Sequence, residues 1–291
     1  MGAKTEIQWA DGTCNPTLGC DGCELRDLVR GIKICYAGHL TDRFGGRKGY
    51  AKKFEVVEKA PGRMAEAARW SDLAGTDRPD SPWLNGLPRV IFISDMGDAL
   101  SKAIDFAYLK TEVIDVVSSP LGQRHEWPWL TKRPARMAKF SAWLMERGIP
   151  WPNNLWAGTS ITSRNTTRRI APLVGVGNER TIHFLSVEPQ WQAIDLSPWL
   201  PQLGWVIQGG QSAKKKVFDT AWARDVRDQC NAANVPYFLK QLGSHVIHGG
   251  YRIKFEDGHG GDWDEWPSDL CVRQMPHVQG NVALADTTCV I

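Results

Sequence analysis

Several short apolar segments along the chain share one pattern, in which β-prone residues run directly into a polar or glycine-rich cluster. They occupy residues 89–93, 127–130, 154–157, 181–185, 205–207 and 236–239. The stretches between them have helical character, at residues 103–118, 135–147, 166–173 and 220–233. Strands that alternate with helices, with no hairpin signal between them, predict a parallel sheet that is buried on both faces.

Together with a first strand predicted at residues 6–9, these segments indicate an α/β fold, a partial or full (β/α) barrel with parallel strands. An open doubly wound sheet is the alternative. The carboxyl ends of barrel strands form the rim on which active sites lie, and the polar clusters of this chain follow strand ends. We expect the barrel to span residues 1–244. Residues 245–291, rich in Gly, His and Asp, are expected to form a short irregular extension or hairpin that packs on the barrel.

Three of the seven cysteines, Cys20, Cys23 and Cys35, lie in a loop at about residues 14–37, which follows the first predicted strand. An odd cysteine count without an export signal disfavours a disulfide framework and favours metal binding or buried thiols. Three thiolates can hold three irons of a [4Fe-4S] cluster and leave the fourth iron open for chemistry. A zinc site would need a fourth ligand from Cys14 or His39, and a cluster that also used Cys14 would be coordinatively closed. Cys230, Cys271 and Cys289 are interpreted as buried or incidental thiols.

Bulk properties limit the partners. No apolar run approaches the roughly 20 residues that span a bilayer, and residues 1–6 contain no apolar signal core, so we expect a cytoplasmic protein with no membrane partner. The net charge of +3 excludes a histone-like polycation but permits a basic cleft.

Motifs over nearly the whole chain carry a family resemblance. They include Ile7–Asp11, Asn15–Cys20, Cys35–Ala37, Ser94–Asp98, Leu130–Pro134, Phe184–Pro189, Trp205–Gly210, Phe238–Gln241 and, in the tail, Trp263–Pro267. In these motifs the chain resembles the phage-associated three-cysteine-motif family of radical S-adenosylmethionine (radical SAM) proteins. Three features depart from that family. Eleven residues separate Cys23 from Cys35 where the family has two, Cys14 stands in place of a tryptophan, and Gln211 replaces a glutamate.

The resemblance implies an enzyme that cleaves S-adenosylmethionine (SAM) at a [4Fe-4S] cluster and abstracts a hydrogen from its substrate. The implied ligands are Cys20, Cys23 and Cys35, with Cys14 as a substitute for Cys23. The phage association favours a nucleobase in DNA as substrate, in a thymine hypermodification that proceeds by radical rearrangement, within the host cytoplasm if the protein is phage-encoded. A flavodoxin or ferredoxin would supply the electron. A peptide or small-molecule substrate is an alternative, as is a non-catalytic nucleic-acid-binding protein with a structural zinc or closed Fe-S site. A SAM-dependent methyltransferase would leave the clustered cysteines unexplained.

The same resemblance and the strand order suggest roles for residues at the rim. The expected cofactor-binding residues are Tyr36, Asp95, Asp98, Ser160, Glu188, Gly209 and Gly210. The expected substrate-binding residues are Lys132, Arg133, Lys240 and Gln241, with added charge from Lys214, Lys215 and Lys216. Cations beside aromatic residues such as Trp127, Trp129 and Trp156 suit a phosphate backbone and a stacked base. For Asp95 a helix-capping role competes with cofactor binding, and for Glu188 a turn with Pro189 does.

Overall fold

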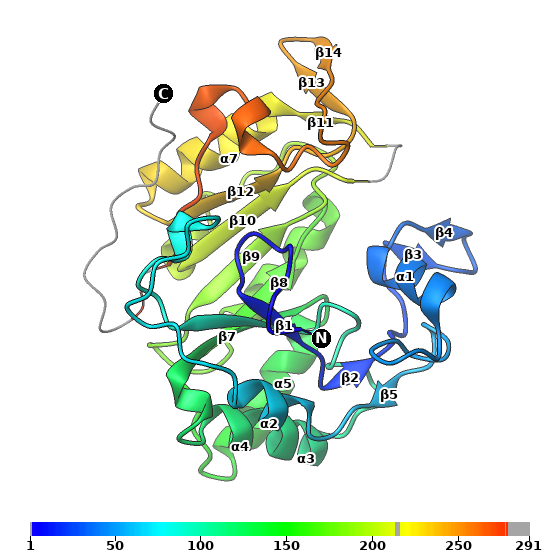
Figure 1. Ribbon diagram of the computed structural model, residues 1–291, viewed down its shortest axis with the longest axis vertical. Coiled ribbons are helices and arrows are strands. Elements are labelled where there is room, and N and C mark those ends of the chain that lie inside the picture. The colour runs from blue at the N-terminus through cyan, green and yellow to red at the C-terminus, as the bar shows by residue number, and fades with distance from the viewer. Residues whose placement is uncertain (1, 213–215, 277, 279–291) are drawn as a thin grey trace. The chain divides into compact units, whose positions relative to one another are not determined.

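The main sheet has seven strands in the order β1-β6-β7-β8-β9-β10-β12 (Figure 1). This computed structural model describes residues 2–212, 216–276 and 278. The strands follow one another across the sheet in chain order, without the reversal that defines a doubly wound fold. The predicted α/β class is therefore confirmed, as a partial barrel with parallel strands. The strands are β1 Gly12–Cys14, β6 Arg89–Ile93, β7 His125–Thr131, β8 Leu155–Ser160, β9 His183–Val187, β10 Trp205–Gly209 and β12 Tyr237–Gln241.

The first strand differs from its prediction. Residues 6–9 contain a turn, and the strand that pairs with β6 is β1, with Gly12 opposite Ile91 and Cys14 opposite Ile93. The indole of Trp9 instead packs against Phe92, with ring centroids 4.6 Å apart. The apolar residues of this segment therefore serve the core as side chains and not as part of the sheet. The cysteine loop still follows the first strand, because β1 ends at Cys14.

The chain divides into two compact units. Unit 1 comprises Met1–Ala74, Pro88–Ala157 and Gly175–Thr181, and unit 2 comprises Gly75–Leu87, Gly158–Val174 and Ile182–Ile291. One boundary between the units falls within β8. The described residues of the extension belong to unit 2, as do β9, β10 and β12.

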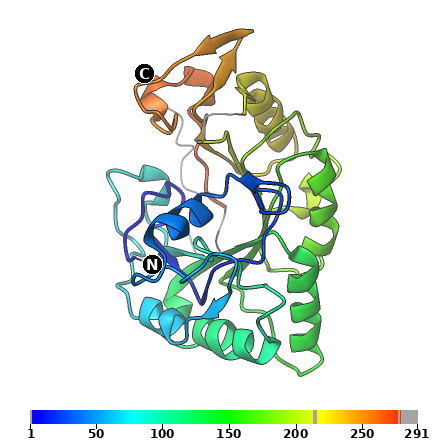
Figure 2. The ribbon, with the colours of Figure 1, turned by 90° about the vertical axis from the view of Figure 1, so that its right-hand side faces the viewer.

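Helices α2, α3, α4 and α5 of unit 1 lie together on one side of its strands, whereas α1 lies apart from them beside β3 and β4 (Figures 1 and 2). The stretch predicted at 103–118 is a continuous helical segment made of α3, a π-helical turn at Lys110–Ile114, and α4. The remaining small pairs of strands are antiparallel: β2 pairs with β5, and β3 pairs with β4. The bounds are α1 Tyr36–Phe44, α2 Arg63–Ala68, α3 Phe106–Leu109, α4 Asp115–Val117, α5 Pro134–Met145, β2 Thr17–Leu18, β3 Arg26–Asp27, β4 Ile32–Lys33 and β5 Glu58–Lys59.

Unit 2 contains α6 (Ile170–Leu173), α7 (Thr220–Ala232) and a small sheet at the start of the extension. In that sheet β13 (Val246–His248) pairs with β14 (Tyr251–Ile253) as an antiparallel hairpin, and β11 (Phe218–Asp219) runs parallel to β13. The hairpin predicted for the extension is thus present.

Arg273 fastens the end of the extension to the core of unit 2. Its buried guanidinium lies over four aromatic rings and donates hydrogen bonds to the carbonyl oxygens of Lys240 and Gly261, at 3.2 and 3.0 Å. The rings are those of Trp83, Phe238, Trp263 and Trp266. Cation–π contacts of this kind are strongest where the cation is desolvated, so the contact holds the extension in place.

The tryptophans of the central strands belong to the core. Trp127, Trp129, Trp156 and Trp205 are fully buried, so the first three are not the exposed platform for a stacked base that the sequence suggested. None of the helices in the part of the chain that the structure describes is long and apolar enough to cross a membrane.

The carboxyl group of Glu126, on β7, should make the stability of the fold depend on pH. Its carboxylate accepts a hydrogen bond from the indole of Trp156 at 2.7 Å, and burial raises its pKa from 4.5 to about 8. Because the folded state binds this proton more tightly than the unfolded chain does, the protonated carboxyl stabilises the fold at low pH. That contribution is lost as the pH rises from about 4.5 towards 8.

Glu126→Gln should therefore be more stable than the wild type at pH 8, by on the order of 3 kcal/mol, and nearly equal to it at pH 4.5. Denaturant unfolding across this pH range measures the difference. Glu146→Gln, which removes an exposed carboxylate, is the matched control and should change the pH profile little. Parallel profiles for Glu126→Gln and the wild type would show that Glu126 is not held protonated.

Candidate functional site

The residues between Cys23 and Cys35 fold into a hairpin that returns Cys35 to the neighbourhood of Cys23 (Figure 1). The backbone N–H groups of Ile34 and Cys35 both donate to the carbonyl oxygen of Leu25, at 2.9 and 3.0 Å. Cys23 and Arg26 exchange two backbone hydrogen bonds, at 3.1 and 2.9 Å. The long spacing in the sequence therefore does not become a long distance in the fold.

Arg26 holds this hairpin against α1. Its side chain is buried, and its guanidinium pairs with Asp42 of α1 at 2.8 Å and with Glu55 at 2.6 Å. The guanidinium also lies over the ring of Phe54, 5.0 Å from its centroid. Because α1 begins directly after Cys35, a hairpin fixed to α1 also fixes the position of Cys35.

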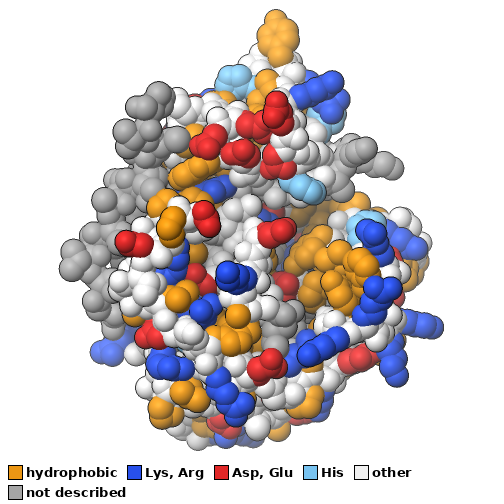
Figure 3. All heavy atoms as spheres, viewed as in Figure 1, with side chains coloured by type: hydrophobic (Ala, Val, Ile, Leu, Met, Phe, Trp, Pro, Cys, Tyr) orange, Lys and Arg blue, Asp and Glu red, His pale blue; other side chains and the backbone are white. Residues whose placement is uncertain are grey.

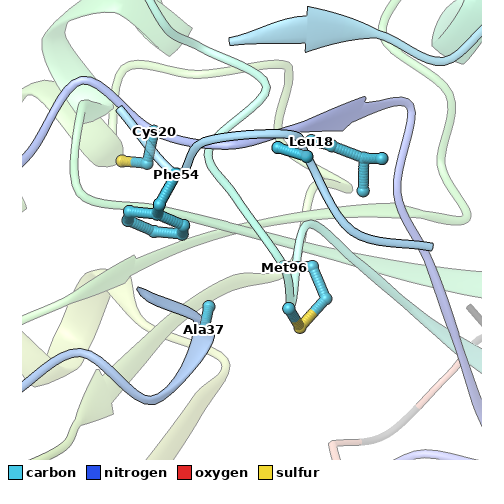
Figure 4. Packing of buried hydrophobic residues seen from close by; sticks show 6 residues of the cluster. Leu18, Cys20, Ala37, Phe54 and Met96 are labelled. Atoms are coloured by element: carbon cyan, nitrogen blue, oxygen red, sulfur yellow. The ribbon is translucent and has the colours of Figure 1, made fainter. Parts of the chain in front are cut away.

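Cys20 belongs to a small apolar cluster (Figure 4), and Cys35 packs against it. Cys35, Leu40 and Tyr50 pack against its buried members, and the N–H of Cys20 donates to the carbonyl oxygen of Phe54 at 2.6 Å. The buried members are Leu18, Cys20, Ala37, Ala51, Phe54 and Met96. Burial raises the pKa of the Cys20 thiol to about 11, helped by Asp98 and opposed by Arg133, and burial also raises the pKa of Cys23. Both thiols are therefore protonated at neutral pH, and a metal ion would have to displace their protons.

Arg133, one of the expected substrate-binding residues, turns towards the cysteine loop. Its guanidinium pairs with Asp98 at 2.8 Å and with Asp21, and it donates to the carbonyl oxygen of Gly22 at 3.1 Å. Its two terminal nitrogens lie 3.7 and 3.9 Å from the sulfur of Cys20. A fixed cation beside this sulfur favours the thiolate that a metal would need.

Asp98 is occupied by the same network. Its buried carboxylate accepts hydrogen bonds from the Thr131 hydroxyl at 2.8 and 2.9 Å and from the Lys132 N–H at 3.1 Å, in addition to the ion pair with Arg133. The ends of β6 and β7 are thus tied together by Asp98, and this side chain positions Arg133 in the structure.

Tyr36 and Asp95 are brought together at the start of α1. The Tyr36 hydroxyl donates to the carbonyl oxygen of Asp95 at 2.6 Å. The carboxylate of Asp95 accepts a hydrogen bond from the amide of Asn15, whose own carbonyl oxygen accepts from the Met96 N–H at 2.9 Å. Burial raises the pKa of Asp95. Asp95 therefore does not cap a helix, and its side chain links the β6 end to the residue after β1.

The surroundings of Cys14 differ from those of Cys20, Cys23 and Cys35. It ends β1, is fully buried, and its thiol donates to the carbonyl oxygen of Arg63 at 3.4 Å. Burial raises its pKa well above the ordinary range. These surroundings fit a spare core thiol better than a substitute ligand.

The donor set fits an iron–sulfur cluster in kind. Cysteine thiolates are the usual ligands of such a cluster, and hydrogen bonds to the sulfurs and limited exposure to solvent tune its properties. Within the described residues, no three His, Cys, Asp or Glu side chains converge in a formed metal site. Binding would therefore draw the three sulfurs together, as is usual for metal sites that form with the metal.

Unit 2 holds its own group of predicted residues. Lys240 pairs with Glu188 at 2.7 Å, and a Cβ at Gly209 would lie 3.3 Å from both the Glu188 carboxyl carbon and Cγ of Gln241. The Gln241 amide donates to the carbonyl oxygen of Gly210 at 2.8 Å. Glu188, Gly209, Gly210, Lys240 and Gln241 thus meet at the ends of β9, β10 and β12.

Three residues at the strand ends of unit 2 are already packed or hydrogen-bonded within that unit. A Cβ at Gly210 would lie 2.0 Å from the Leu242 carbonyl oxygen, so packing against β12 requires this glycine. The Gln211 side chain accepts a hydrogen bond from the indole of Trp191 at 3.1 Å. Ser160 ends β8 and is buried, and its carbonyl oxygen accepts from Arg169 at 3.0 Å. Lys214 and Lys215 lie outside the described residues.

A comparison with known protein families gives a match that covers most of the chain. A family model described as "Protein of unknown function (DUF5131)" matches residues 4–281. The chain belongs to this family. No curated protein and no solved structure matches it. The DUF5131 span includes the cysteine loop, the Arg133 network and the Glu188–Lys240 pair.

Sequence reasoning missed two residues of this candidate site, Asn15 and Arg26. Asn15 had a weak signal, since an Asn-Pro dipeptide marks a turn, but its partners lie about 80 positions away in the chain. Arg26 had no signal, because an arginine in a loop is ordinarily exposed and its two partners are 16 and 29 positions distant.

The hairpin geometry gives a testable expectation. The hydrogen bonds from Ile34 and Cys35 to Leu25 lie at the base of the hairpin. They do not involve the residues at its tip, 28–31. Replacing residues 28–31 with Asn-Gly, the preferred two-residue hairpin turn, should leave the iron content after reconstitution unchanged and alter the stability by less than about 1 kcal/mol. Iron analysis and thermal unfolding measure both quantities. A loss of iron as large as that in Cys35→Ala would show that the tip, and not only the base, is needed.

Proposed function

We propose that this DUF5131 protein is a radical SAM enzyme that holds a [4Fe-4S] cluster on Cys20, Cys23 and Cys35. The observation that carries the proposal is the hairpin base, where Leu25 accepts hydrogen bonds from Ile34 and Cys35 and so brings the third cysteine back to the first two. The family resemblance of the sequence motifs adds to it. Three cysteines, and not four, are the number that leaves an iron open to SAM.

When bound, the cluster and SAM would together supply a 5′-deoxyadenosyl radical that abstracts a hydrogen atom from the substrate. The residues of the chain provide the setting. Arg133 places a cation at the Cys20 sulfur and is itself held by Asp98 and Asp21. The apolar cluster around Cys20 and Cys35 limits water at the sulfurs. Tyr36 is half exposed directly after Cys35, where it can contact a bound cofactor.

In the proposed reaction the substrate is a nucleobase in DNA, modified by radical rearrangement, and the electron comes from a flavodoxin or ferredoxin in the cytoplasm. An enzyme that acts on a duplex base must extrude it into a pocket. Lys132, whose N–H donates to Asp98, lies at the end of β7 beside the cysteine loop and is suited to a phosphate there.

The test is to purify the protein without oxygen, reconstitute it with iron and sulfide, and record EPR spectra of the reduced form before and after addition of SAM. We expect a four-iron signal that changes with SAM, and 5′-deoxyadenosine in the mixture. A protein that holds zinc, or a cluster whose spectrum ignores SAM, would overturn the proposal and favour a non-catalytic nucleic-acid-binding protein. Formation of 5′-deoxyadenosine that DNA does not stimulate, but a peptide or small molecule does, would overturn only the substrate.

A further inference from the structure

The segment from Arg43 to Lys53 concentrates positive charge on the surface of unit 1. Five cations, and no acidic residue, occur within it, so the rest of a chain with a net charge of +3 carries a net charge of −2. All five side chains are exposed. Figure 3 shows Lys and Arg side chains gathered around the part of the molecule that holds α1, β3 and β4. The five are Arg43, Arg47, Lys48, Lys52 and Lys53, hereafter the basic segment.

Apolar residues fix the basic segment to the cysteine loop. Ala51 and Phe54 belong to the buried cluster that contains Cys20, and Tyr50 packs against the same cluster. The backbone is closed on itself, since the Gly46 N–H donates to the Ala51 carbonyl oxygen at 3.0 Å. The cations are therefore carried on an ordered loop that is attached directly to the proposed cluster site.

The acidic residues that flank the basic segment in the sequence already have partners. Glu55 and Asp42 both pair with the buried Arg26, and the Glu58 carboxylate accepts a hydrogen bond from the Lys52 backbone N–H at 3.0 Å. The guanidinium groups of Arg43 and Arg47 lie over the ring of Phe44, 5.0 and 5.4 Å from its centroid. An ordinary solubilising surface mixes charges of both signs, whereas here the five cations and Arg26 exceed the three carboxylates of Asp42, Glu55 and Glu58 by three charges, and Arg43 and Arg47 are held against Phe44.

We propose that the basic segment binds the phosphate backbone of DNA and so holds the substrate strand beside the cysteine loop. The inference rests on the proposed function for the identity of the polyanion, but the binding itself needs neither cluster nor SAM. Exposed cations without base-reading side chains contact phosphates and carry no sequence preference, so the binding should depend strongly on salt and little on sequence.

The experiment measures binding of a labelled DNA duplex of about 30 base pairs to the full chain by fluorescence anisotropy, between about 50 and 200 mM salt. Each phosphate contact that is lost makes the slope of log K against log salt shallower by about 0.9. The triple variant Lys48→Gln/Lys52→Gln/Lys53→Gln should therefore have a slope shallower by about 2.7 and an affinity at 100 mM salt that is lower by on the order of a hundredfold.

The matched control removes three exposed cations elsewhere, in Lys139→Gln/Arg252→Gln/Lys254→Gln, and should change the slope by less than one unit. Thermal unfolding establishes that both variants fold. Equal losses in the two variants, or no loss in the first, would overturn the inference. So would unchanged DNA binding combined with slower reduction by a flavodoxin, which would make the basic segment the site of an acidic electron donor. SAM cleavage is measured separately, without DNA. A failure of the DNA-binding inference can therefore be told apart from a failure of the proposed function.

Discussion

Replacement of Cys35 by alanine is expected to remove the SAM-cleaving activity that we propose for the reconstituted protein. Cys35 is the third ligand of the proposed cluster, which the hairpin brings back towards Cys23, and a cluster on two cysteines would lack one of the three protein bonds that leave a single iron open. We expect SAM cleavage to fall by at least about a thousandfold, equivalent to more than about 4 kcal/mol of transition-state stabilisation. Iron content and 5′-deoxyadenosine formation, both measured under anaerobic conditions, check this expectation.

Cys14→Ala is the matched control, because it also removes one thiol from the cysteine loop region. The thiol of Cys14 faces the Arg63 carbonyl oxygen within the core, so its loss should cost about 1 kcal/mol of stability and leave iron content and SAM cleavage near those of the wild type. If Cys14→Ala lost its iron while Cys23→Ala kept it, Cys14 would be the middle ligand. Cleavage at the wild-type rate in Cys35→Ala would remove the radical SAM proposal.

The sheet could be predicted because its information is local. Each of the main-sheet strands β6, β7, β8, β9, β10 and β12 contains an apolar run that is followed by a polar cluster, and that pattern is complete within about ten residues of sequence. The error at residues 6–9 has the same origin. Trp9 and Ile7 look like strand residues, but the pairing of Gly12 with Ile91 depends on a partner about 80 positions away. Strand type is therefore readable from the sequence, whereas pairing depends on tertiary contacts.

The candidate site was predictable in its location and less so in its contacts. The polar strand ends Asp98 and Arg133 were correctly expected at the same edge of the sheet, because parallel strands require it. Their directions could not be derived, since Arg133 turns to Asp21 and Gly22, more than 100 positions earlier in the chain. The hairpin had one local signal, Gly31, which adopts a positive φ of 69° at the turn.

Arg133→Met is expected to destabilise the fold and to reduce the iron content together. The variant leaves the buried carboxylate of Asp98 without its cation and the Cys20 sulfur without a charged donor. Removing one partner of a buried ion pair typically costs about 3–5 kcal/mol, and the remaining hydrogen bonds from Thr131 and Lys132 place the expected loss near the lower figure. Chemical denaturation before reconstitution measures the stability without any contribution from the cluster.

Two further variants separate the roles of Arg133. Asp98→Asn/Arg133→Met removes both charges, so its stability loss should be smaller than the sum of the two single losses, as expected for residues in one network. Lys132→Ala is the matched control, because only its backbone bonds to Asp98, and it should change the stability by less than about 1 kcal/mol. A variant Arg133→Met with normal stability and iron content, but with impaired turnover of DNA, would return Arg133 to the substrate-binding role that its sequence position suggests. The expected outcome instead makes Arg133 the residue through which the ends of β6 and β7 fix the first cysteine of the loop.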